Sequence, residues 1–136
     1  MIERELFEIR HAVRAADGGW RLVDGLNVRR EYRRQRHASS YALVGFRLTP
    51  SDVLTLEFEV AWPDSFTPGY QQNIERAVAL GVVDGLYGHA FSQFPAAVVL
   101  TEFGWDEIGG SELAVYEATV EALSEARTRG EWRLAS

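Results

Sequence analysis

The sequence contains no cysteine and no lysine. Without cysteine it has no disulfide bonds, no thiolate zinc ligands and no cysteine nucleophile. It also has no apolar run near the roughly 20 residues that span a bilayer, and the charged start from Met1 to Glu5 is unlike a signal peptide. We therefore expect neither export nor membrane contact, and a cytoplasmic location.

Motifs for catalysis and metal binding are also missing. There is no Gly-x-x-x-x-Gly-Lys-Ser/Thr phosphate loop, so the chain does not hydrolyse GTP through one. No serine lies in a Gly-x-Ser-x-Gly motif, and His11, His37 and His89 lie too far apart in sequence for a His-x-x-x-His pair. We therefore expect no catalytic residue, no metal ion and no cofactor.

The composition that is present is typical of one folded domain. The 136 residues are 46% hydrophobic and include sixteen aromatic side chains, four of them tryptophan. A second domain would leave each half too small to bury its own core, so residues 1–136 are expected to form a single domain. The net charge of -6 is uneven, because residues 77–126 hold eight acids and no arginine. This acidic half repels phosphate backbones, so any nucleic-acid contact must come from the first half.

Apolar periodicity predicts the order of the elements. Alternation around Asp17-Gly18-Gly19 predicts an N-terminal β-hairpin, an extension within residues 1–31. Residues 40–48 and 53–62 alternate on either side of a short turn and predict an antiparallel pair. Then follow a helix over 70–88, a central strand within 94–103 and a helix over 111–128. Together they predict an α+β fold: one mostly antiparallel sheet with two helices on one face.

Two glycines interrupt the helix predicted over residues 70–88. Gly81 and Gly85 each cost about 1 kcal/mol relative to alanine inside a helix. We expect them where the helix comes close to the sheet, or where it ends.

Several short motifs follow one another along residues 32–127. In order they are Ser40 to Val44, Tyr70 and Ile74, Ala77 to Gly81, Phe94-Pro95, and Ser111-Glu112-Leu113-Ala114, which opens an alanine-rich helix ending in Glu125-Ala126. In this order they resemble domain IV of elongation factor G, a family with the fold called S5 domain 2-like. The resemblance implies a stand-alone relative without a GTPase, with a role in translation and the ribosome or RNA as its partner.

The loop before the last helix departs from that family. In the translational factors this loop is a ribosome-probing tip, with a histidine and then an acid a few residues before Ser-Ser-Glu. Here the corresponding stretch is Gly104 to Gly110, in which Trp105, Asp106 and Glu107 are the tip-loop candidates. An acid stands where the family has histidine, which puts the family's mode of contact in doubt.

Residues 29–37 are the one anion-binding candidate on the chain. Arginine forks suit phosphate groups, and an interleaved tyrosine suits base stacking. Three interpretations stay open for this patch: ion pairs with the acidic half of this chain or of another copy, a solvated face, or a nucleic-acid site. The RNA- or anion-binding candidates are Arg29, Arg30, Arg33, Arg34 and Arg36.

Two groups of acidic residues in the second half of the sequence are candidate sites besides the arginine patch. Glu102, Asp106, Glu107 and Glu112 are close in sequence and suit a hard cation, acid and base chemistry with His89, or the positive end of a helix dipole. On the last helix, a like-charged row at four-residue spacing favours cations, which the arginine patch of a second copy would supply in a homodimer. This row consists of Glu117, Glu121 and Glu125.

These observations lead to one first hypothesis for function. The chain is expected to be a non-catalytic binding module, associated with the ribosome or RNA. The alternatives are a small enzyme or ligand-binding protein that uses the Asp106 and Glu107 loop, and a purely self-associating structural domain.

Overall fold

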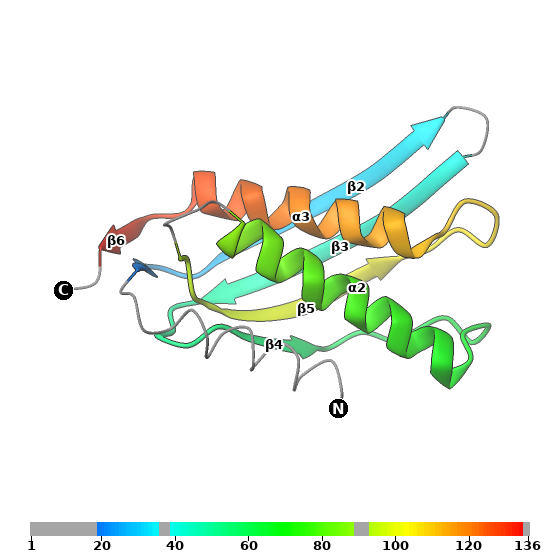
Figure 1. Ribbon diagram of the computed structural model, residues 1–136, viewed down its shortest axis with the longest axis horizontal. Helices are drawn as coiled ribbons and strands as arrows, with labels where there is room; N and C mark the ends of the chain where they lie inside the picture. Colours follow the sequence, from blue (N-terminus) through cyan, green and yellow to red (C-terminus); the bar gives the residue numbers. More distant parts are fainter. Residues whose placement is uncertain (1–18, 36–38, 89–92, 135–136) are drawn as a thin grey trace.

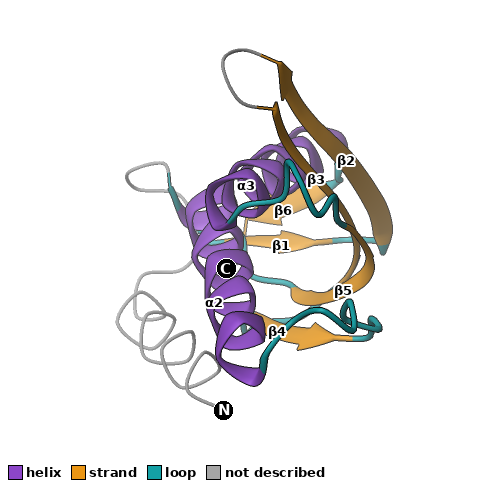
Figure 2. Cartoon of the chain, turned by 90° about the vertical axis from the view of Figure 1, so that its right-hand side faces the viewer, coloured by secondary structure: helices purple, strands orange, loops and turns teal. Residues whose placement is uncertain are grey.

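The computed structural model describes residues 19–35, 39–88 and 93–134, which form two layers (Figure 1). One layer is a four-stranded sheet in the order β2-β3-β5-β4, and both helices lie on one face of it (Figure 2). The predicted α+β class is therefore confirmed. The elements are β1 Trp20–Leu22, β2 Leu26–Gln35, β3 Ser39–Thr49, β4 Thr55–Phe58, α2 Pro68–Tyr87, β5 Ala97–Gly104, α3 Glu112–Arg129 and β6 Trp132–Leu134.

The strand pairing differs from the prediction. β3 does not pair with β4; it pairs antiparallel with β2 on one side and β5 on the other, and β4 pairs parallel with β5. β5 lies inside the sheet, between β3 and β4, and its residues Val98, Val99 and Leu100 are buried in succession. α2 connects the parallel strands β4 and β5, as helices usually do in such crossovers. β2 was not predicted at all.

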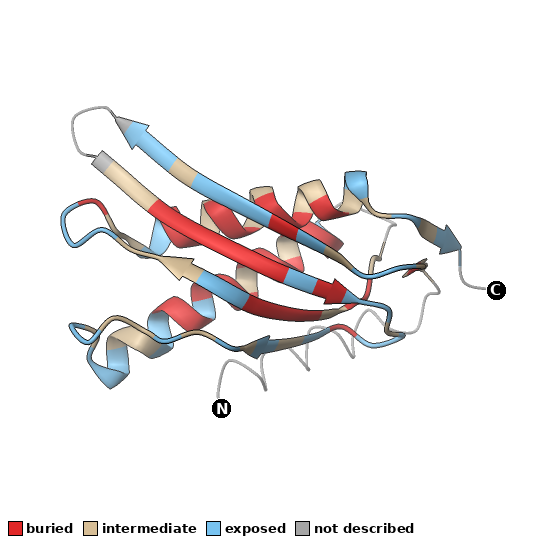
Figure 3. Ribbon diagram, turned by 180° about the vertical axis from the view of Figure 1, so that it is seen from behind, coloured by how far each residue is buried: buried red, intermediate tan, exposed pale blue. Residues whose placement is uncertain are grey.

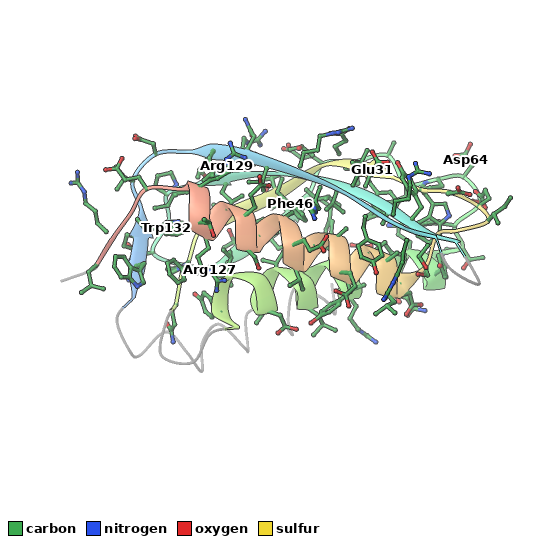
Figure 4. All side chains as sticks on the ribbon, turned by 90° about the horizontal axis from the view of Figure 1, so that it is seen from above. Glu31, Phe46, Asp64, Arg127, Arg129 and Trp132 are labelled. Atoms are coloured by element: carbon green, nitrogen blue, oxygen red, sulfur yellow. The ribbon has the colours of Figure 1, made fainter. Side chains whose placement is uncertain are left out.

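Both helices lie where the sequence predicts them, and each begins at a hydroxyl cap. The side chains of Thr67 and Ser111 accept hydrogen bonds from backbone N–H groups in the first turns of α2 and α3. The predicted alanine row of α3 is buried throughout, and its members are Ala114, Ala118, Ala122 and Ala126. The helices cover the core, in which Phe46 of β3 lies between the sheet and α3 (Figure 4).

Gly81 and Gly85 face α3, so the expectation that they lie against the sheet is wrong, whereas Gly85 does lie in the last turn of α2, which ends at Tyr87. A Cβ atom added at Gly81 would lie 2.7 Å from Thr119, and one added at Gly85 would lie 2.7 Å from Leu123. The two helices are therefore packed more closely than any larger side chain at these positions allows.

A second, two-stranded sheet joins the two ends of the described chain. β1 pairs antiparallel with β6, and Trp20 donates its N–H to the carbonyl of Gln93 at 2.8 Å. The first arm of the predicted N-terminal hairpin lies outside the described residues, and the strand at 20–22 has β6 as its partner. Within the described part of the chain, no helix is long and apolar enough to cross a membrane.

Candidate functional site

β2 places four of the five candidate arginines in alternation on the two sides of one strand. Arg29 and Arg33 lie on the open face of the sheet, away from the helices, while Arg30 and Arg34 lie on the side of α3. Figure 3, seen from the open face, shows β2 as mostly exposed and its neighbour β3 as mostly buried. Arg36 lies outside the described residues.

Three of these arginines form ion pairs within the chain. The Nε atoms of Arg29 and Arg30 lie 3.0 Å from carboxylates of the second half, Glu102 on β5 and Glu121 on α3. The hydrogen bond to Glu102 raises the pKa of Arg29. The acidic second half of the sequence thus supplies the carboxylates that pair with these two arginines of β2.

Arg33 and Arg34 are less tied to the acidic half. Arg33 pairs within β2, 3.0 Å from Glu31, and its guanidinium lies 4.8 Å from the centre of the Tyr41 ring. Arg34 is exposed and has no ion pair among the described residues. Exposed pairs of this kind are weak, about 0–1 kcal/mol each, so they leave the arginines available to other anions.

Tyr41 connects this end of β2 to the loop before α3. Its N–H donates to the carbonyl of Gly109 at 2.9 Å, and it forms an isolated bridge with Gly110. Since Tyr41 is also the partner of Arg33 in the register of β2 and β3, the basic end of the hairpin lies beside the tip loop.

The tip loop, residues 105–110, is held by its own acidic residues. Asp106 accepts hydrogen bonds through Oδ1 from the N–H groups of Ile108 and Gly109, at 2.8 and 3.3 Å. Glu107 accepts a hydrogen bond from the hydroxyl of Ser65 at 2.7 Å. The two candidate acids of this loop therefore maintain its shape, and Ile108, between them and the glycines, is 93% exposed.

Trp105 packs back on the domain. Its ring contacts Phe66, Tyr70 and Phe103, with centroids 4.9 to 5.9 Å apart. Gly110 lies against the indole, where a Cβ atom would come within 2.4 Å of the ring. Partial burial in this cluster raises the pKa of Tyr70.

The four acidic residues near the tip do not gather into one site. Glu102 pairs with Arg29, while Asp106 and Glu107 bind within the tip region. Among the described residues, no group of three or more His, Asp or Glu side chains is placed to hold a metal ion. His89, the suggested partner for catalysis, lies outside them.

Two carboxylates of the acidic row on α3 form ion pairs with arginines of the same chain. Arg30 reaches Glu121, and Arg129 lies 3.6 Å from Glu125, four residues earlier on the helix. Because these two carboxylates are already paired, the row supplies less attraction for a second copy than its sequence suggests. Homodimerisation remains a prediction that no contact here tests.

Two features of the surface were missed. One is Ile108 of the tip loop, whose side chain is almost fully exposed and which was not singled out from the sequence. The hydrogen bond from the hydroxyl of Tyr116 to Asp84, 2.6 Å long, joins α3 to α2 and had no signal in the sequence. It raises the pKa of Tyr116 to about 12.

The fold and this surface define an α+β domain with a basic strand beside a braced loop. No protein-family model matches the chain, and no curated protein matches it. Among solved structures it is similar to the crystal structure of a protein from Thermus thermophilus, with a TM-score of 0.65 and 17% identity. The match covers 88% of this chain and 18% of that one, and at this identity it shows a shared fold.

Proposed function

We propose that this chain is a non-catalytic binding module that contacts ribosomal RNA with one end, the role implied by its resemblance to domain IV of elongation factor G. The observation that carries the proposal is the junction at Tyr41. There the arginine end of β2 meets the loop that occupies the place of the family's ribosome-probing tip. Phosphate-binding side chains and an exposed apolar side chain, Ile108, thus belong to the same end of the molecule.

The charge distribution limits the form of this contact. The net charge of -6 repels RNA at long range, so binding depends on the few arginines without a partner in the acidic half. Among the four candidate arginines that the structure describes, Arg33 and Arg34 are the two in that position. Two phosphate contacts predict that affinity falls roughly tenfold for a fourfold rise in salt concentration.

The experiment is pelleting of the purified protein with purified ribosomes at low salt. Arg33 and Arg34 are changed together to Glu, and a matched control changes Arg129 and Arg133 to Glu. The control lowers the net charge equally, but at the end where β6 lies. The proposal expects the first variant to lose ribosome binding about tenfold or more and the control to retain it.

Equal losses in the two variants would show that binding follows net charge, and the end-specific contact would be rejected. A wild-type protein that stays in the supernatant at low salt would reject the ribosomal role altogether. A third variant, Ile108→Ser, separates the contributions, since it leaves both arginines and the net charge unchanged and removes the exposed apolar side chain.

A further inference from the structure

We propose that the outer edge of β2 binds an extended acidic segment of a partner protein, which adds to the sheet as a fifth strand. β2 is ten residues long and stands at the end of the strand order, with β3 as its one neighbour among the described residues. The opposite edge strand, β4, is four residues long. This inference shares Arg33 and Arg34 with the RNA contact proposed at the tip, but it rests on the backbone groups of the whole strand.

Contacts of β3 establish which backbone groups of β2 face outward. Tyr41 donates its N–H to Gly109, and the carbonyl of Gly45 accepts a hydrogen bond from Thr101 on β5 at 3.2 Å. The odd-numbered residues of β3 therefore direct their backbone groups toward β5. In an antiparallel ladder neighbouring residues alternate in this direction, so the even-numbered residues of β3 bond to β2.

The register carries this alternation across to β2. Even-numbered residues pair with even-numbered ones, as Val28 does with Phe46, so the odd-numbered residues of β2 direct N–H and C=O away from the sheet. A separate contact supports this direction for the odd-numbered residue Asn27. Its carbonyl accepts a hydrogen bond at 3.5 Å from the side chain of Arg129, which is not part of the sheet. Arg29, Glu31 and Arg33 are left with outward backbone groups, the requirement for strand addition.

Side chains along this edge favour an acidic occupant. Arg29 and Arg33 flank Glu31 on the open face, and Arg30 and Arg34 lie on the helix side. Arg29 and Arg30 make their ion pairs through Nε, and their side chains are 58% and 51% exposed. The terminal N–H groups of the two guanidinium groups can therefore bind carboxylates on a neighbouring strand, where opposite charges attract.

The same charges disfavour a second copy in this position. A symmetric antiparallel pairing of two β2 strands around Glu31 would set Arg29 of each copy against Arg33 of the other, and like charges directly opposite are destabilising. RNA phosphates could also bind the arginines. RNA lacks peptide groups, however, so it cannot form the alternating backbone hydrogen bonds that the outward N–H and C=O groups of β2 offer.

The test uses a nine-residue peptide, acetylated and amidated at its ends, in which glutamate alternates with threonine and valine. Amide hydrogen exchange is followed by NMR on the full chain. In the free protein, the amides of Arg29, Glu31 and Arg33 should exchange quickly and those of Val28 and Arg30 slowly. Adding the peptide should slow exchange at the odd-numbered set, with little change at the even-numbered set.

Two altered peptides and two protein variants make the result specific. Replacing glutamate by lysine, or N-methylating the peptide amides that face β2, should each weaken binding about tenfold or more, whereas N-methylation of the alternate set should have little effect. Arg29→Glu should weaken binding as well. Arg47→Glu, which breaks one equally exposed ion pair on the inner strand β3, should not.

Several results would overturn the inference. These are slow exchange at the odd-numbered amides without peptide, peptide binding that leaves their exchange unchanged, and equal binding of both N-methylated peptides. Protection by an RNA oligonucleotide in place of the peptide would also reject it. Slow exchange at Val28 and Arg30 in each variant shows that β2 is still folded, so a loss of binding can be assigned to the edge.

Discussion

On the face of the sheet that α2 and α3 cover, β3 contributes four residues with almost no exposed surface, whereas on the open face it contributes two buried residues, Leu43 and Gly45, the partly buried Tyr41, and the exposed Arg47 and Thr49. The covered residues are Ala42, Val44, Phe46 and Leu48. The open face is crossed by ion pairs, such as that between Arg47 and Glu59 at 3.2 Å. The contrast is sharpest between the adjacent residues Phe46 and Arg47, which predicts very different responses to substitution at these two positions.

The largest expected effect is at the centre of the covered face. Phe46→Ala removes a ring that is 1% exposed and leaves a cavity between the sheet and α3, so it should cost about 3–5 kcal/mol of unfolding free energy. Arg47→Ala, at the next residue on the open face, should cost about 0.5 kcal/mol or less. Urea unfolding measures both, and similar losses would contradict the division between the faces.

A second prediction concerns the helix interface behind that face. Gly85→Ala improves helix propensity but places a methyl group 2.7 Å from Leu123, so overpacking should leave a net loss of about 1–2 kcal/mol. Gly69→Ala in the first turn of α2 meets no atom within 4 Å and should instead stabilise the protein by about 0.5 kcal/mol. Thermal unfolding checks the opposite signs, and a gain at Gly85 would show that the helices are not closely packed.

A smaller effect is expected on the outer side of the helix pair. Tyr116→Phe removes the hydrogen bond to Asp84 and should cost about 1 kcal/mol near neutral pH. Folding raises the pKa of Tyr116 from 10.0 to about 12, so its contribution is complete below pH 10 and is lost as the pH rises toward 12. Tyrosinate absorbance should show one late-titrating group in the wild type that the variant lacks. A wild-type titration without that group would contradict the bond.

The smallest effect on stability is expected at the edge of the open face. Arg29→Ala breaks an exposed ion pair with Glu102 and should leave the unfolding midpoint unchanged within error, although the same arginine is expected to matter for peptide binding. The measurement is urea unfolding with Arg47→Ala as the reference. A clear loss of stability would mean that β2 depends on this pair, and that recognition and stability are not separated there.

The helices and the central strand follow from local signals. Four buried alanines at four-residue spacing and a serine cap specify α3, and a continuous apolar run specifies β5. β2 was not predicted because the arginine pairs at 29–30 and 33–34 hide the alternation of Leu26, Val28 and Tyr32. The long aliphatic part of an arginine side chain allows it to lie on either face of an edge strand, so arginines can occupy consecutive positions there. Its partner could not be predicted, because nothing local indicates that β5 enters between β3 and β4.

The candidate site was only partly predictable for a similar reason. The arginine patch is visible as a run of like charges, but its partners Glu102 and Glu121 are more than 70 residues away in sequence. Whether Trp105 or Ile108 faces solvent depends on aromatic residues from three different segments, Phe66, Tyr70 and Phe103. Sequence identifies the charged residues, whereas exposure depends on tertiary contacts.

Sucrose-gradient sedimentation of a cell lysate at low salt, with the protein detected across ribosomal and soluble fractions, tests the proposed role most directly. The account predicts that the protein travels with ribosomal particles, leaves them as salt rises, and fails to join them when Arg33 and Arg34 are changed to Glu. A protein that stays at the top of the gradient at every salt concentration would contradict a ribosomal role for this domain.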